Sequence, residues 1–168
     1  MGAAAGLHNA AHTLADCMKH VKKSVLLWHS PREMYALVTG VEDYPKFLPW
    51  CERAEVLERR DDGVTARLHL AYAGLRQAFT TKNVQVADES VVLSLVDGPF
   101  SSLDGTWRFL PLPPADGPTA ASCRIEFELR YAFANGALEA LISPVFDRIA
   151  STFVDSFVKR AEQVHGDG

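Results

Sequence analysis

The fold of this chain is decided by the stretch CRIEFELRYAF, residues 123–133, and by the long segment that follows it. Within residues 123–133, apolar side chains occupy every second position and charged side chains occupy most of the others. Such alternation is typical of an antiparallel strand that is covered on one face only. From Ala137 to about His165 the apolar period becomes 3.6, which predicts one helix roughly 40 Å long. Pro144 predicts a bend or a break one turn into that helix.

Upstream of this strand, a period of two recurs between Trp50 and Leu110 and predicts further strands. Residues 75–87 are of mixed character, so the register of that strand stays open. Turn residues interrupt the pattern at three places, as expected for hairpins: Asp61-Asp62-Gly63, Ala73-Gly74 and Asp97-Gly98-Pro99. Residues 19–29 alternate imperfectly and predict a first strand.

Two short helices are predicted after the first strand. The string Ser30-Pro31-Arg32-Glu33 places a capping hydroxyl, a proline at the first helical position and a carboxylate three residues after the cap. A second short helix is expected near residues 44–48. The whole order predicts an α+β fold, in which a curved antiparallel sheet of six to seven strands is closed by the C-terminal helix.

The composition indicates one globular domain. The chain has 168 residues, of which 48% are hydrophobic and 23% charged. Its net charge of −4 argues against a protein that coats nucleic acid, and no DNA partner is expected. We predict a single domain over residues 18–166, preceded by a disordered extension at 1–17. The proline-rich residues 111–119 are expected to form an exposed loop.

The cysteines and the lengths of the apolar runs indicate where in the cell the protein is located. Three cysteines lie far apart without a C-x-x-C pair, which suits a reducing compartment. No apolar run approaches the roughly 18 residues that span a bilayer. We therefore expect a cytoplasmic protein.

A long sheet covered by one helix often leaves space between the two layers. The alternation places a set of apolar side chains toward that space: Leu68, Leu70, Tyr72, Phe79, Trp107, Phe109, Ile125, Phe127 and Leu129 from the strands, with Phe146, Ile149 and Phe153 from the helix. Periodicity by itself does not distinguish a filled interior from a hollow one.

Specific strings carry a resemblance to a known family. YPKFLPWC at residues 44–51, DGPF at 97–100, WRF at 107–109 and CRIEF at 123–127 resemble the coenzyme Q-binding START-like family, as does the closing helix. This group includes the RatA-type ribosome association toxins and has often been labelled oligoketide cyclase. The likeness extends from about Met18 to Gly166.

The resemblance implies a helix-grip fold with a hydrophobic tunnel that binds ubiquinone or a related isoprenoid lipid in support of respiration. Ubiquinone would be a ligand, and no cofactor is required. Phe47, Leu48 and Trp50 would lie near the tunnel mouth and meet lipid, and Tyr72, Trp50 or Trp107 would donate to the quinone head. Transient contact with a membrane surface, peripheral to the inner membrane, would follow.

Two alternatives stay open. The bacterial branch of the family implies a toxin that binds the large ribosomal subunit and blocks subunit joining, for which short clusters of Lys and Arg would have to meet RNA phosphate. Those clusters are Lys19, Lys22 and Lys23, Arg59 and Arg60, and Lys159 and Arg160.

The second alternative is a cyclase-like enzyme. The predicted apolar faces hold no buried acid or arginine, although Arg76 and Lys82 would reach inward in one register of their strand. Cys51 is interpreted as a packed side chain, and no catalytic or metal-binding constellation is visible.

Overall fold

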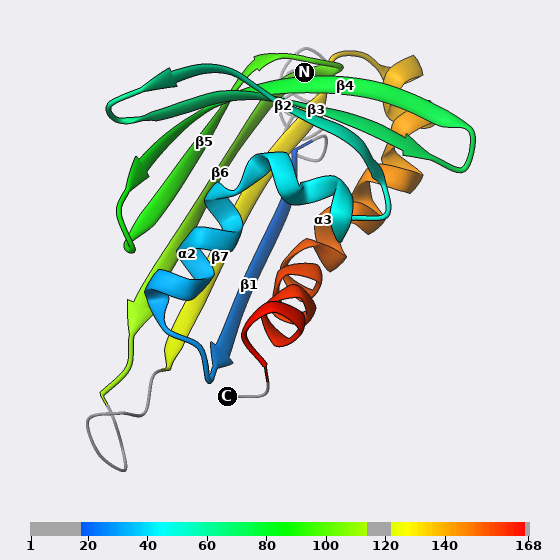
Figure 1. The fold of residues 1–168 in the computed structure, drawn as a ribbon. Coiled ribbons are helices and arrows are strands. Elements are labelled where there is room, and N and C mark those ends of the chain that lie inside the picture. Colours follow the sequence, from blue (N-terminus) through cyan, green and yellow to red (C-terminus); the bar gives the residue numbers. More distant parts are fainter. Residues whose placement is uncertain (1–17, 114–121, 167–168) are drawn as a thin grey trace, which may run out of the picture.

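The computed structural model describes residues 18–113 and 122–166 (Figure 1). The predicted extension at 1–17 and most of the predicted loop at 111–119 lie outside these residues. Within them the elements follow the predicted order of strand, two short helices, six strands and one long helix.

Seven antiparallel strands form one strongly curved sheet (Figure 1). In spatial order they are β1 (Lys19–Leu27), β7 (Cys123–Phe133), β6 (Phe100–Pro111), β5 (Ser90–Asp97), β4 (Leu75–Val86), β3 (Gly63–Tyr72) and β2 (Cys51–Arg60). The predicted hairpins are all present, and the first strand pairs with the last one. The curved α+β fold is confirmed.

One glycine in the DGPF string is required by the backbone. Gly98, between β5 and β6, has φ +148°, a region that side chains other than glycine rarely adopt. A Cβ at this position would lie 2.7 Å from the Cβ of Phe79 on β4. The turn can therefore pack against β4 only because the residue is glycine.

The predicted capping box at the start of α2 (Pro31–Thr39) is confirmed. Ser30 Oγ accepts from the Glu33 amide at 3.1 Å, and Glu33 Oε1 accepts from the Ser30 amide at 2.9 Å. The second helix is η1, a 3-10 helix at Val41–Lys46, so the prediction of residues 44–48 was about three residues late. Its early start follows from the turn at Gly40, whose carbonyl accepts from the Asp43 amide at 3.0 Å.

The strand and helix at the C-terminal end are as predicted. Every inward side chain of β7, from Cys123 to Phe133, is buried. Helix α3 (Gly136–His165) begins at the cap residue Asn135 and runs without interruption through Pro144, so a break there is excluded. Pro144 and Ala140 are both exposed, and water can satisfy the Ala140 carbonyl that the proline leaves free.

Helix α3 lies across the concave face of the sheet, and α2 and η1 lie beside it (Figure 1). Aromatic rings from the sheet and α3 meet between the layers. Trp107 packs against Phe127 at 4.6 Å between ring centroids, and Phe146 packs against Tyr131 at 4.7 Å. None of the helices in residues 18–113 and 122–166 combines the length and apolar character needed to cross a membrane.

Candidate ligand cavity

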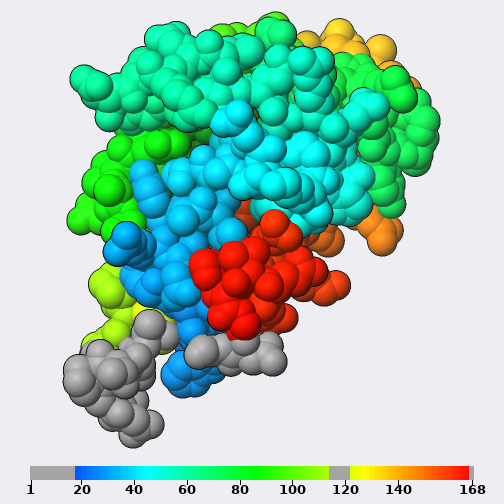
Figure 2. Space-filling model, in the orientation of Figure 1, coloured from blue at the N-terminus to red at the C-terminus, as the bar shows by residue number. Residues whose placement is uncertain are grey.

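A cavity of about 70 Å³ lies between the sheet, η1, the end of α2 and the middle of α3. The space-filling view shows a hollow between α2 and the β2–β3 side of the sheet (Figure 2). The wall of the cavity is almost wholly apolar: Val38, Val41, Tyr44, Trp50, Ala66, Leu68, Phe79, Thr81, Asn83, Val91, Leu93, Leu103, Trp107, Phe127, Leu129, Phe146, Ile149, Ala150 and Phe153.

Nine residues predicted to contact ligand line this cavity: Trp50, Leu68, Phe79, Trp107, Phe127, Leu129, Phe146, Ile149 and Phe153. Leu48, Leu70, Phe109 and Ile125 are buried in the core but do not line it. They belong to the same hydrophobic cluster as the residues of the wall. Contact of any of these residues with a ligand stays a prediction.

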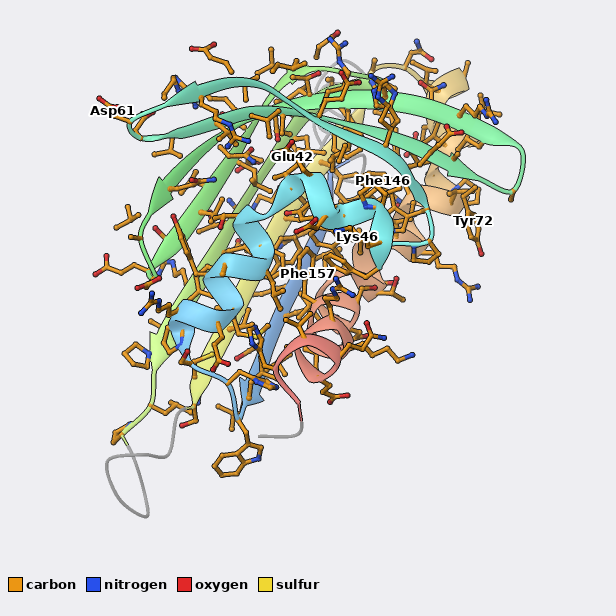
Figure 3. All side chains as sticks on the ribbon, in the orientation of Figure 1. Glu42, Lys46, Asp61, Tyr72, Phe146 and Phe157 are labelled. Carbon is orange, nitrogen blue, oxygen red and sulfur yellow. The ribbon has the colours of Figure 1, made fainter. Side chains whose placement is uncertain are left out.

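Two further predicted residues lie elsewhere. Phe47 is half-buried; its ring packs edge-on against Phe157 at 5.1 Å and carries the Arg160 guanidinium over its face at 5.3 Å. Tyr72 is 42% exposed at the end of the β3–β4 hairpin, away from Phe146 and Phe157 (Figure 3). Tyr72 therefore does not lie on the cavity wall as predicted, because this hairpin end extends past the elements that cover the sheet. Contact of its hydroxyl with a ligand stays a prediction.

The interior is more filled than a lipid tunnel would be. Phe153 lies 5.7 Å from Trp107 and 5.6 Å from Phe127, centroid to centroid, so aromatic rings occupy the middle of the space. Sites for drug-sized ligands usually measure about 300–1,000 Å³. A cavity of about 70 Å³ has room for a few water molecules, and a larger occupant would require these walls to move apart.

Ten residues of the wall were not among the predicted ones: Val38, Val41, Tyr44, Ala66, Thr81, Asn83, Val91, Leu93, Leu103 and Ala150. Thr81 and Asn83, which face the cavity from β4, are the two whose side chains make it partly polar. Residues 79, 81 and 83 alternate inward, but Thr81 and Asn83 are polar. The alternation of apolar and polar residues that predicts an inward face in the other strands is therefore missing here. The same register turns Arg76 and Lys82 outward. Arg76 is exposed and pairs with Glu52 at 3.6 Å, and Lys82 is exposed as well, so the strand adopts the register that leaves both cations outside.

Titratable groups around the cavity stay neutral. Burial raises the pKa of the Tyr44 hydroxyl well above its usual range, and this hydroxyl donates to the Val38 carbonyl. Burial also raises the pKa of Cys51 to about 11, which makes its thiol a poor nucleophile. The described residues bring no charged side chain to the cavity wall and no three potential metal ligands together. This chemistry suits binding of an apolar molecule that carries few polar groups.

Comparison with known proteins identifies the family. Residues 27–158 match the family described as polyketide cyclase / dehydrase and lipid transport. The chain belongs to this family. The resemblance found in the sequence strings is thereby confirmed, and the helix-grip architecture is shared by solved members of the fold.

Relatives of this family member carry two kinds of name. The ribosome association toxin RatA of Pseudomonas aeruginosa is 39% identical over 88% of this chain and 98% of that protein. The persistence and stress-resistance toxin PasT of Escherichia coli is 37% identical over 88% of this chain and 90% of that protein. The mitochondrial coenzyme Q-binding protein COQ10 homolog B of Xenopus laevis is 27% identical over 95% of this chain and 65% of that protein.

Solved structures confirm the fold of this family member. The Zhui aromatase/cyclase from Streptomyces superposes with a TM-score of 0.73 at 17% identity, covering 87% of this chain and 94% of that one. An 18 kDa protein from Caulobacter crescentus superposes with a TM-score of 0.66 at 32% identity, covering 88% of this chain and 99% of that one.

Proposed function

We propose that this protein binds an isoprenoid quinone such as ubiquinone in the cavity beneath α3 and carries it without chemical change. The observation that carries the proposal is the cavity wall, which is apolar apart from a few hydrogen-bonding groups and contains no charge among the described residues. Each methylene of an isoprenoid tail that leaves water contributes roughly 0.8 kcal/mol, so such a wall can bind the tail without any reaction.

Binding would require the cavity to widen from about 70 Å³. The aromatic side chains that fill it come from different elements, with Trp107 on β6 and Phe153 on α3. Both rings would have to move for a ligand of this size to enter. A carrier of this type would work in the cytoplasm and collect its ligand at a membrane surface.

Binding is tested by tryptophan fluorescence and native mass spectrometry. Trp28 is 75% exposed, and its signal would mask that of the two cavity tryptophans, so the titration uses the W28F variant. Added ubiquinone should quench Trp50 and Trp107, and native mass spectrometry of protein from a quinone-producing bacterium should show the bound lipid. Protein that emerges empty and remains unquenched would contradict the proposal.

A matched pair of variants on α3 tests whether the ligand occupies this cavity. Ala150 lines the cavity, whereas Ala140 is exposed on the same helix. Ala150→Leu should fill the space and weaken quinone binding, and Ala140→Leu should leave binding unchanged. Circular dichroism would verify that both variants are folded. Equal binding by both would place the ligand elsewhere on the protein.

A second function, association with the large ribosomal subunit, is favoured by the names of the relatives at 36–39% identity. Several basic residues are already engaged: Arg59 pairs with Glu42, Lys19 with Asp147, and Arg60 donates to Thr65 at 2.7 Å. On the outer face of β1 and β6, Lys22 and Arg108 line a surface groove that Glu126 and Glu128 of β7 also line. Neither cation has an ion-pair partner among the described residues. We propose that these two cations contact the phosphate groups of ribosomal RNA.

Sucrose gradients test this second function. Protein added to purified subunits should lower the 70S fraction, more strongly at low salt because phosphate contacts release counterions. Lys22→Glu should weaken the effect. Arg76→Glu, with the same change of charge on the distant β3–β4 hairpin, should not. An unchanged 70S fraction with the unaltered protein would exclude the ribosomal role.

A further inference from the structure

Two polar side chains interrupt the apolar wall of the cavity from neighbouring inward positions of β4. Thr81 is 7% exposed and Asn83 is 6% exposed. Thr81 Oγ1 donates to Asn83 Oδ1 at 2.7 Å. The surrounding strand residues that share this wall are apolar: Ala66 and Leu68 on β3, with Val91 and Leu93 on β5.

The bond with Thr81 leaves most of the hydrogen-bonding capacity of Asn83 unused. An asparagine side chain has two N–H donors and an oxygen that accepts twice. Among the described residues, the Asn83 amide nitrogen has no partner, in contrast to the Tyr44 hydroxyl, which donates to the Val38 carbonyl. An acceptor in the cavity that reaches this nitrogen would complete its bonds, which an apolar molecule would not do.

The position of Asn83 is held firmly. Its backbone pairs with Val64 on β3 and with Leu93 on β5, and its carbonyl accepts from Arg60 Nη2 at 3.3 Å. With the amide oxygen turned to the Thr81 hydroxyl, the amide N–H groups are the atoms left free. A fixed donor in an apolar cavity is the arrangement that gives a ligand its orientation.

Packing alone does not account for the pair. Two apolar side chains of the same shape, valine and leucine, would fill the same volume without buried polar atoms, and such replacements are often neutral or stabilising. The polar pair is therefore expected where a bound molecule brings an acceptor to it.

We propose that Asn83 is a binding residue that donates its side-chain N–H to a carbonyl oxygen of the ligand, and that Thr81 is a positioning residue that orients the amide. This inference rests on the proposed carrier function and adds the group that selects a quinone over a pure hydrocarbon of similar shape. The ligand class is an apolar molecule with a ring carbonyl, and the tail lies among the aromatic residues of the wall.

The test compares two ligands in the W28F background. Ubiquinone with two isoprene units is titrated directly by quenching, and farnesene, which lacks oxygen, is titrated by displacement of a fluorescent apolar probe. Asn83→Leu should weaken quinone binding about tenfold, the size of one well-formed hydrogen bond, and leave farnesene binding unchanged. Thr81→Val should weaken quinone binding about threefold.

Thr80→Val is the matched control. Thr80 is also buried on β4, but its hydroxyl accepts from Arg67 Nε at 3.2 Å and does not line the cavity. This variant should bind both ligands as the unaltered protein does. A second readout needs no mutation: the Asn83 side-chain amide signals in a ¹⁵N NMR spectrum should shift on adding the quinone and stay in place on adding farnesene.

The outcomes separate the two proposals. If the unaltered protein binds neither ligand, the carrier function fails. If it binds the quinone, but Asn83→Leu binds it equally well and the Asn83 amide signals do not move, the carrier function stands and the role of Asn83 is overturned. Should Asn83→Leu not fold, Thr81→Val and the NMR spectrum still decide the matter.

Discussion

At the scale of single residues, one buried tyrosine forms a hydrogen bond between the sheet and the long helix. Tyr131 is almost wholly buried on β7, and its hydroxyl donates to Asp147 Oδ1 on α3 at 2.6 Å. Lys19 on β1 pairs with the other oxygen of the same carboxylate at 3.4 Å. One tyrosine hydroxyl thus joins the sheet, the helix and the edge strand.

Tyr131→Phe should lower the free energy of unfolding by about 1.5–3 kcal/mol, the usual net contribution of a hydrogen bond to a charged group. The phenyl ring keeps the packing against Phe146, so the loss should not exceed this range. Urea denaturation measures it. A loss no larger than that of Tyr35→Phe, whose hydroxyl has no partner among the described residues, would show that the bond to Asp147 contributes nothing.

The two buried cysteines should be unreactive in the folded protein. Burial raises the pKa of both Cys51 and Cys123 to about 11, so thiolate is scarce at pH 8. Iodoacetamide at pH 8 should leave both unmodified in buffer and alkylate both in urea, as read by peptide mass spectrometry. Rapid labelling of Cys51 in buffer would contradict its interpretation as a packed side chain.

At the scale of elements, the start of α2 contacts the end of α3. Glu33, in the first turn of α2, accepts from the Ser30 amide and also lies 3.2 Å from Nδ1 of His165, the last residue of α3. The bond from the Ser30 backbone holds the pKa of Glu33 below its ordinary value of 4.5. Glu33 therefore caps the start of α2 and at the same time contacts the last residue of α3.

The stability of this junction should depend on pH. A carboxyl whose pKa is lowered by folding stabilises the protein fully above the unfolded pKa, here about 4.5, and loses that contribution as pH falls through the lower folded value. Unfolding free energy measured by urea at several pH values should fall below pH 4.5. Glu33→Gln should make this fall shallower. The same steepness in both proteins would exclude Glu33 as a source.

At the scale of the whole molecule, the grip of the sheet on α3 depends on aromatic packing between the layers. Phe157 is fully buried among Tyr44, Trp107 and Phe47, whereas Phe153, one turn earlier, lines the cavity and is only half-buried. The Phe157 ring belongs to the hydrophobic core. The Phe153 ring fills space that a ligand would need.

Replacing these two rings by alanine should have different effects. Phe157→Ala should lower the free energy of unfolding by about 3–5 kcal/mol, the usual cost of a large buried cavity. Phe153→Ala should cost less, because its ring is partly exposed, and should tighten quinone binding by enlarging the cavity. Urea denaturation and fluorescence titration measure the two quantities. Weaker quinone binding by Phe153→Ala would mean that this ring contacts the ligand more than it excludes it.

The strand order in the chain, the capping box and the C-terminal helix could be predicted because each depends on residues close together in sequence. Alternation in residues 123–133 specifies a half-covered strand wherever that strand pairs, and Ser30 caps a helix through its own neighbours. Pattern also found nine of the nineteen residues of the cavity wall, because inward positions on a strand are every second residue. It failed at Tyr72, where burial depends on how far a hairpin extends.

The sequence by itself determined the curved sheet, its covering helix and the apolar character of what lies between them, because side-chain periodicity is a local property of strands and helices. Only the tertiary structure decided how much space remains, since about 70 Å³ is what is left after rings from several distant segments have packed together. The tertiary structure alone also placed Thr81 and Asn83 in that space. A polar residue on a strand can face either solvent or the interior, and the pairing of β4 with β3 and β5 decides which.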